Sequence, residues 1–141
     1  MENIIIKLGP YVEQREPIPY TRGGDTVRER THYGWRPGMS EQESWLSAQG
    51  WWHLSPTRAL GTQLAIAVNN EGTVVAVAQV EGVVKGEDRH WILGRLEPTG
   101  KYRPWVGRKM HTNDSRNPIA YSDMRDFIDP EQVDESTEYI N

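Results

Sequence analysis

The chain has 141 residues, which suits one ordinary domain, and its hydrophobic content of 36% is low but above that of disordered chains. It contains no cysteine, which excludes disulfide scaffolds, thiolate metal sites and a cysteine nucleophile. The net charge of −4 is unevenly spread: residues 122–141 hold seven acids and one base, a net of −6, so residues 1–121 carry −4 minus −6, or +2. The composition therefore predicts one mildly basic domain over residues 1–121, followed by an acidic tail.

The N-terminal stretch does not fit a targeting segment. Its one short apolar run follows the acid Glu2 and has no basic region before it, unlike a signal peptide. No part of the chain approaches the roughly 18 consecutive apolar residues of a membrane helix. These features predict a cytoplasmic protein that has no membrane partner.

The first part of the chain predicts a strand followed by a long irregular segment. Residues 3–8 are apolar and β-branched, as is typical of a strand. Residues 9–38, which contain five arginines, show no clear hydrophobic period. A structureless loop of this length is uncommon in a compact domain. We therefore expect either a short strand around residues 26–30 or a loop that acts as a functional lid.

Two helix starts follow. Ser40 and Glu43 have the spacing of a capping box, which predicts a helix that Gly50 ends. Ser55 and Pro56 then have the pattern of an N-cap and a first helical residue, which predicts one further helical turn.

The strongest structural signal is a hairpin over residues 62–80. Its two runs are apolar on both faces and are separated by the turn residues 69–72, so we expect it to be central, with a packed layer on each side. Residues 89–96 predict a third strand, residues 101–110 a further strand interrupted by Pro104, and residues 117–121 an extended segment.

Few helices and about six short strands indicate the α+β class. We expect a small, strongly bent mixed sheet or a partly open pseudo-barrel, with short helices at its edges. This β-rich domain occupies residues 1–121, and the acidic tail begins with a short helix over residues 122–128.

The sequence predicts neither a metal site nor a cofactor. The four histidines are far apart, and none has the i, i+4 spacing of a helical ligand pair: His32, His53, His90 and His111.

Two patterns suggest catalysis or phosphate binding, and each has a structural interpretation that we favour. His53 and Ser55 would lie together if one strand ran through both, but Ser55 followed by proline is typical of an N-cap. Residues 22–25 are glycine-rich without the spacing of a phosphate loop, and are typical of a turn. The alternative is a hinge that brings Arg22 to a ligand.

Aromatic and basic residues alternate at several places in the chain, most clearly at Trp35, Trp51, Trp52, His53 and Arg58. Nucleic-acid bases stack on aromatic rings, and arginine both stacks and pairs with phosphate. Adjacent residues of a strand face opposite sides, so one of the two neighbouring tryptophans should lie near the surface or in a pocket. The alternative is that the tryptophans belong to the core and the arginine stems pack over them.

Residues 51–121, about half of the chain, resemble a known module. The resemblance rests on Trp52-x-Leu54-Ser55-x-x-Arg58, the hairpin runs Leu64–Val68 and Gly72–Val77, a strand with Gly94, a turn at Tyr102–Gly107, and Asn117-Pro118-Ile119-x-Tyr121. This pattern resembles an uncharacterised module that follows GIY-YIG-type nuclease domains in some bacterial proteins. It is also similar in layout to the PUA-like superfamily, which includes the EVE and ASCH domains.

The resemblance implies a pseudo-barrel that binds RNA or reads modified bases in an aromatic-lined pocket. By position it places Trp52, Ser55, Arg58, Asn117 and Tyr121 near that pocket. The chain departs from the pattern because it lacks the GIY-YIG motif and has the additional first strand and arginine-containing segment.

Our leading hypothesis is a non-enzymatic binding module for a nucleotide, a modified base or a short nucleic acid. Trp51 or Trp52 would stack the ring, Arg58 and Arg22 would meet phosphate, and Asn117 would bind the base edge. A first alternative is a nucleotide- or nucleic-acid-processing enzyme that uses His53, Ser55 and Arg58. A second is a protein-interaction partner that acts through the acidic tail.

Overall fold

The computed structural model describes residues 2–22, 25–86, 88–96, 103–110 and 117–122, and for residues 13–32 only their backbone. Its elements along the chain are β1 (Asn3–Lys7), β2 (Val12–Arg22), β3 (Asp25–Tyr33), α1 (Glu41–Gln49), α2 (Pro56–Leu60), β4 (Leu64–Val68), β5 (Val74–Lys85), β6 (His90–Leu96), the 3-10 helix η1 (Arg103–Trp105) and β7 (Ile119–Ser122).

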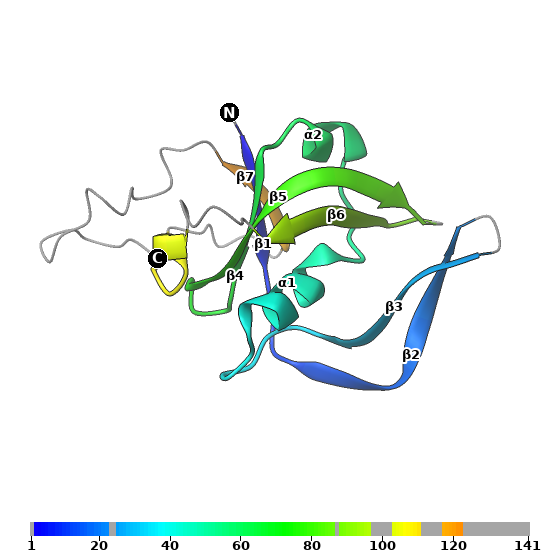
Figure 1. The fold of residues 1–141 in the computed structure, drawn as a ribbon, viewed down its shortest axis with the longest axis horizontal. Coiled ribbons are helices and arrows are strands. Elements are labelled where there is room, and N and C mark those ends of the chain that lie inside the picture. The colour runs from blue at the N-terminus through cyan, green and yellow to red at the C-terminus, as the bar shows by residue number, and fades with distance from the viewer. Residues whose placement is uncertain (1, 23–24, 87, 97–102, 111–116, 123–141) are drawn as a thin grey trace, which may run out of the picture.

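Five strands form one open mixed sheet in the order β6-β5-β4-β1-β7, and β2 and β3 pair only with each other (Figure 1). Strand β1 runs parallel to β4 and antiparallel to β7. Its position in the sheet follows from its sequence, because Ile4, Ile5 and Ile6 are all buried and need a packed layer on both faces. The α+β class and the mixed sheet are confirmed.

Each face of the sheet has its own core. On one face the small pairs Ala65–Ala78 and Ala67–Ala76 lie side by side on β4 and β5, which lets α1 approach closely and insert Trp45. The opposite face is filled by larger aliphatic side chains of the same strands, and Trp105 and Met110 cover it. The hairpin predicted over residues 62–80 is therefore central, as its two apolar faces required.

Both helix starts are confirmed. The Ser40 hydroxyl accepts a hydrogen bond from Glu43 N, and the Glu43 carboxylate accepts one from Ser40 N, both over 3.1 Å. Ser55 caps α2, with Pro56 as its first residue, and Gly61 ends it.

Two predicted elements differ from the structure. Residues 9–38 hold a long two-stranded hairpin, β2–β3: the strand expected around residues 26–30 lies within the longer β3, and its partner β2 was not predicted. Its strands pair only with each other, so their sequence does not need the apolar alternation of a sheet packed on a core. Residues 103–105 form a 3-10 helix instead of a strand, because Pro104 has no N–H for a ladder. After this helix, Gly107 N donates to Val74 O, and Val74 N donates to Arg108 O, at the start of β5. The helix predicted over residues 122–128 lies outside the described residues apart from Ser122, which belongs to β7.

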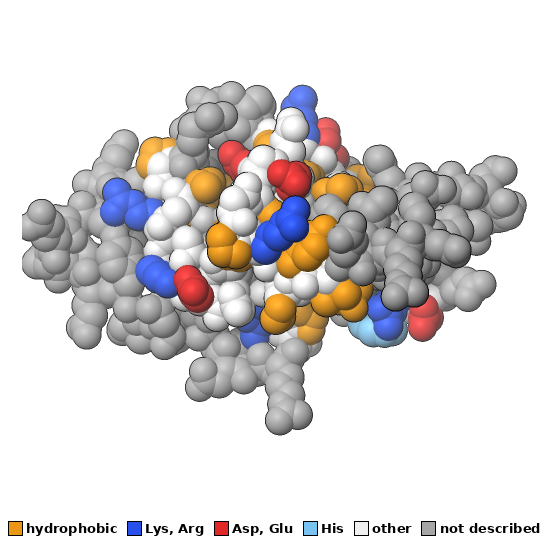
Figure 2. All heavy atoms as spheres, turned by 90° about the horizontal axis from the view of Figure 1, so that it is seen from below, with side chains coloured by type: hydrophobic (Ala, Val, Ile, Leu, Met, Phe, Trp, Pro, Cys, Tyr) orange, Lys and Arg blue, Asp and Glu red, His pale blue; other side chains and the backbone are white. Residues whose placement is uncertain are grey.

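The surface combines hydrophobic and charged side chains. The face seen in Figure 2 shows hydrophobic side chains gathered beside Lys and Arg. Large hydrophobic residues exposed within the described part of the chain are Val12, Tyr33 and Leu60. No described helix is long and apolar enough to cross a bilayer.

Candidate binding site

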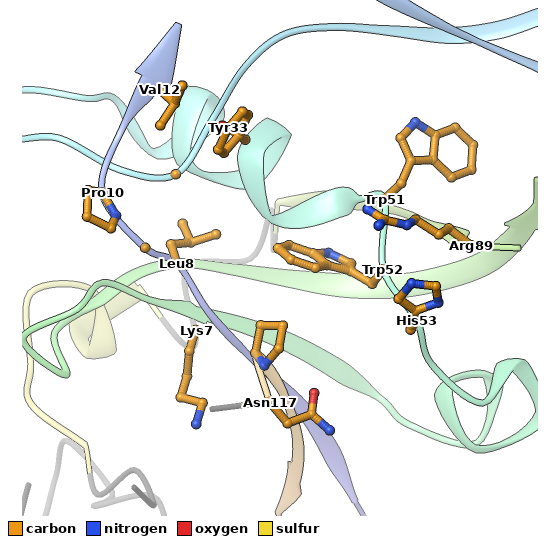
Figure 3. Close-up of a pocket in the computed structure, with 13 residues that line it drawn as sticks. Lys7, Leu8, Pro10, Val12, Tyr33, Trp51, Trp52, His53, Arg89 and Asn117 are labelled. Carbon is orange, nitrogen blue, oxygen red and sulfur yellow. The ribbon is translucent and has the colours of Figure 1, made fainter. Parts of the chain in front are cut away.

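The main pocket has a volume of about 920 Å³, which is at the upper end of the range for small-molecule sites. It lies where five parts of the chain meet (Figure 3): the end of β1, the base of the β2–β3 hairpin, the segment after α1, the turn before β6 and the segment before β7. Its lining consists of Lys7, Leu8, Gly9, Pro10, Val12, Tyr33, Gly34, Trp51, Trp52, His53, Arg89, Asn117 and Pro118.

Backbone hydrogen bonds hold these segments together. Lys7 N donates to Pro118 O over 2.8 Å, and Trp35 N donates to Gly9 O over 2.9 Å. Gly34 has a φ of 81°, and a Cβ there would collide with the Pro10 carbonyl. A glycine is therefore required where the hairpin returns to the sheet and closes one side of the pocket.

The lining is aromatic and basic, and it contains no Asp or Glu among the residues that the structure describes. Lys7, His53 and Arg89 contribute the basic groups. His53 and Arg89 are exposed, and neither forms an ion pair within the described ranges. In Figure 3 Arg89 lies beside His53, and Lys7 extends toward Asn117 on another side of the pocket. Such a lining favours a ligand that carries negative charge.

The two neighbouring tryptophans face opposite ways, as their adjacent positions predict. Trp51 is 4% exposed, and its indole packs against Trp91 with ring centroids 5.1 Å apart. Trp52 is half-buried, and Figure 3 shows its ring directed toward Leu8. Its Nε1 donates to Ala48 O over 2.7 Å, which fixes the indole on the end of α1. Trp52 is therefore the stacking candidate, whereas Trp51 is a core residue that borders the pocket.

A second pocket of about 420 Å³ adjoins the main one, since His53 and Asn117 line both. The rest of its lining consists of Leu54, Ser55, Arg58, Ile119, Ala120 and Tyr121. Again no Asp or Glu is among the described lining residues. The second pocket is thus smaller and more polar than the main one.

Arg58 dominates the electrostatics of the second pocket. Its Nη2 and Nε donate to the two carboxylate oxygens of Glu2 over 2.8 and 3.2 Å, and its guanidinium lies 4.0 Å from the centre of the Tyr121 ring. The hydrogen bond that Arg58 donates to Glu2 raises the pKa of Arg58. Burial raises the pKa of Tyr121, and the nearby Arg58 cation opposes this shift in part. The phenol therefore stays neutral at physiological pH.

Ser55 and Asn117 have structural roles at this site. The Ser55 hydroxyl oxygen accepts a hydrogen bond from Arg58 N over 3.3 Å, which confirms the N-cap interpretation. The side-chain oxygen of Asn117 accepts one from Ile119 N over 3.0 Å and so shapes the chain before β7. Both residues position the strands and helix that carry Arg58 and Tyr121.

Seven of the nine predicted site residues line one or both pockets: Trp51, Trp52, His53, Ser55, Arg58, Asn117 and Tyr121. Trp35 lies outside both linings and packs against the core, half-buried. The side chain of Arg22 lies outside the described residues.

Sequence reasoning missed Lys7, Tyr33 and Arg89 in the main pocket, and Glu2 as the partner of Arg58. Lys7 is the last residue of the apolar strand β1, and Tyr33 is the last residue of β3, directly before Gly34. Both therefore lie at the ends of strands, where pockets form. Nothing local indicates that Arg89 or Glu2 meets residues more than 30 positions away.

The described residues contain no group of three or more His, Asp or Glu side chains placed to hold a metal ion. No protein-family profile, curated protein or solved structure matches this chain. The two adjoining pockets and their chemistry are therefore the features that indicate a function.

Proposed function

We propose that the protein is a non-enzymatic binding module for a ligand that combines a flat ring with negative charge: a nucleotide, a modified base carrying phosphate, or the end of a short nucleic acid. The observation that supports this most is the main pocket, whose described lining joins aromatic rings to three basic side chains and includes no carboxylate.

The ring of the ligand stacks on Trp52. Stacking on an aromatic side chain suits every base, because each has a π face. The hydrogen bond to Ala48 O holds the indole in one orientation before the ligand arrives, so less conformational entropy is lost on binding. Tyr33, which is 38% exposed and also lines the main pocket, provides a second aromatic surface.

The charge of the ligand meets Arg89, His53 and Lys7. Arginine pairs with phosphate through two parallel hydrogen bonds, and lysine contributes a point charge. Because His53 and Arg89 are exposed at the pocket, salt screens their attraction, so affinity for a phosphorylated ligand falls as ionic strength rises.

We favour binding over catalysis because the described residues of the two pockets show no activated nucleophile. The Ser55 oxygen already serves as an N-cap, and the described lining of both pockets has no carboxylate. The PUA-like resemblance points in the same direction, since it implies a base-reading module.

The test is a thermal-shift screen of the purified chain against nucleosides, nucleotides, modified nucleosides and short DNA and RNA oligomers, at low and high salt. A ligand that binds the folded state raises the melting temperature as its excess over Kd grows. We expect nucleotides to raise it more than the matching nucleosides, and high salt to reduce that difference. If no compound with a ring and a phosphate changed the melting temperature, the proposal would be wrong.

A further inference from the structure

We propose that the second pocket is a phosphate subsite in which Glu2 occupies Arg58 until a phosphate group of the ligand displaces it. Only the placement of the ligand's ring rests on the function proposed above. The phosphate site itself depends on Arg58 and the residues that contact it.

The bond between Arg58 and Glu2 has the geometry of anion recognition. Two guanidinium nitrogens donate to the two oxygens of one carboxylate, over 2.8 and 3.2 Å. A phosphate group presents the same pair of acceptor oxygens at similar spacing and carries more negative charge. Glu2 therefore acts as a built-in substitute for the anion that this arginine is arranged to hold.

The Glu2–Arg58 pair is exposed to solvent, and Arg58 has other contacts within the pocket. The side chains of the pair are 53% and 44% exposed, and exposed ion pairs of this kind are weak. Arg58 lies over the Tyr121 ring at 4.0 Å, an attraction that does not depend on Glu2. Its backbone N–H is fixed by the Ser55 cap of α2. After Glu2 leaves, the guanidinium still faces the pocket.

The two pockets are close enough for one ligand. His53 and Asn117 line both, so a ring on Trp52 and a phosphate on Arg58 can belong to the same molecule. Neither described lining includes an acid, so the carboxylate of Glu2 on Arg58 is the acidic group that a phosphate must displace. In this arrangement a ligand breaks the ion pair between Glu2 and Arg58 only if it carries a phosphate group; a ring alone leaves the pair intact.

The experiment is a titration of the full chain with inorganic phosphate at constant ionic strength, followed by NMR of the arginine Nε–H signals. The variants are Glu2→Gln and Arg58→Gln, with Arg58→Lys as a milder change. The matched controls are Glu81→Gln and Arg95→Gln, which alter an exposed ion pair of 3.8 Å on β5 and β6 outside both pockets. Thermal unfolding of each variant establishes that it is folded.

We expect Glu2→Gln to tighten phosphate binding by about two- to fivefold, the range set by the weakness of exposed pairs. Arg58→Gln should abolish saturable binding, Arg58→Lys should weaken it, and both controls should bind phosphate as the wild type does. Equal phosphate affinity in Glu2→Gln and Glu81→Gln, or wild-type binding by Arg58→Gln, would overturn the inference.

The same variants separate this inference from the proposed function. If a nucleoside binds and needs Trp52, while phosphate binding ignores Glu2 and Arg58, the subsite is refuted and the function stands. If phosphate responds to both residues but no nucleoside or nucleotide binds, the subsite stands and the proposed function fails.

Discussion

Gly94 should be one of the least replaceable positions of the sheet. It pairs with Val80 across β5 and β6, where the register shifts. A Cβ on Gly94 would collide with the carbonyl oxygen of Gln79 and would lie 3.0 Å from Cζ2 of Trp45. Gln79 contributes backbone at this contact, which cannot rotate away as a side chain can. Gly94→Ala must therefore move the backbone of β5 or β6, and its Cβ also presses on the Trp45 indole of α1.

Overpacking of this kind costs about 1–3 kcal/mol, and we expect the upper end because backbone must shift. About 3 kcal/mol corresponds to a fall in melting temperature of roughly 6–15 °C for a domain of this size. The matched control is Gly82→Ala on the neighbouring strand, where the new Cβ would lie 3.6 Å from Cδ1 of Leu93, an ordinary contact. Gly82→Ala should instead stabilise the protein slightly, by up to about 1 kcal/mol, because the unfolded chain loses freedom.

Urea unfolding of the wild type and both variants measures these free energies. The same shift should reach the site, since Trp45 belongs to α1 and the Ala48 carbonyl at the end of α1 holds Trp52. Gly94→Ala should thus also weaken nucleotide binding, while Gly82→Ala should not. Equal stability of the two variants would refute the account of how β5, β6 and α1 pack.

Three further predictions concern the cap of α1, the pH dependence of stability and the packing of Trp51 on Trp91. Ser40→Ala removes one half of the capping box and should lower the free energy of unfolding by about 1 kcal/mol, measured by urea unfolding, with the exposed Gln42→Ala as control. Burial raises the pKa of Tyr121 above the ordinary value of 10.0. The neutral phenol therefore contributes fully to the stability of the folded state below pH 10, and this contribution is lost as pH rises through the pKa of Tyr121 in the folded state. Melting temperatures above pH 10 should therefore fall less steeply for Tyr121→Phe than for the wild type, and identical slopes would contradict the buried position of the phenol. Trp51→Ala should cost about 3–5 kcal/mol of stability, as expected for a buried indole, and a change below 1 kcal/mol would exclude the packing of Trp51 on Trp91.

Local signals predicted the elements that depend on neighbours in the sequence. The Ser40–Glu43 box and the Ser55–Pro56 cap each involve groups three residues apart, so the sequence contains the whole interaction. The central hairpin was predictable because both of its faces are buried and its strands are therefore apolar throughout. The pairing of β2 with β3 was not predictable, because these strands pair only with each other and show no apolar period.

The site was predictable only in part, for the same physical reason. Trp52, His53, Ser55 and Arg58 are close in sequence, so a spacing argument groups them. Arg89 reaches the site because Trp52 and His90 exchange backbone hydrogen bonds, and Lys7 because β1 pairs with β7. These pairings join distant segments, and no local pattern encodes them.

The central claim is that the main pocket binds a flat, anionic ligand on Trp52. The most direct measurement is a calorimetric titration of the wild type, Trp52→Ala and Trp52→Phe with the nucleotide that gives the largest thermal shift, with Arg95→Gln as a surface control. Stacking contributes about 1–3 kcal/mol per base, so Trp52→Ala should weaken binding by roughly 5- to 150-fold. Trp52→Phe should lose less, because it retains a ring, and the control should bind as the wild type does. Unchanged affinity in a folded Trp52→Ala protein would contradict the account.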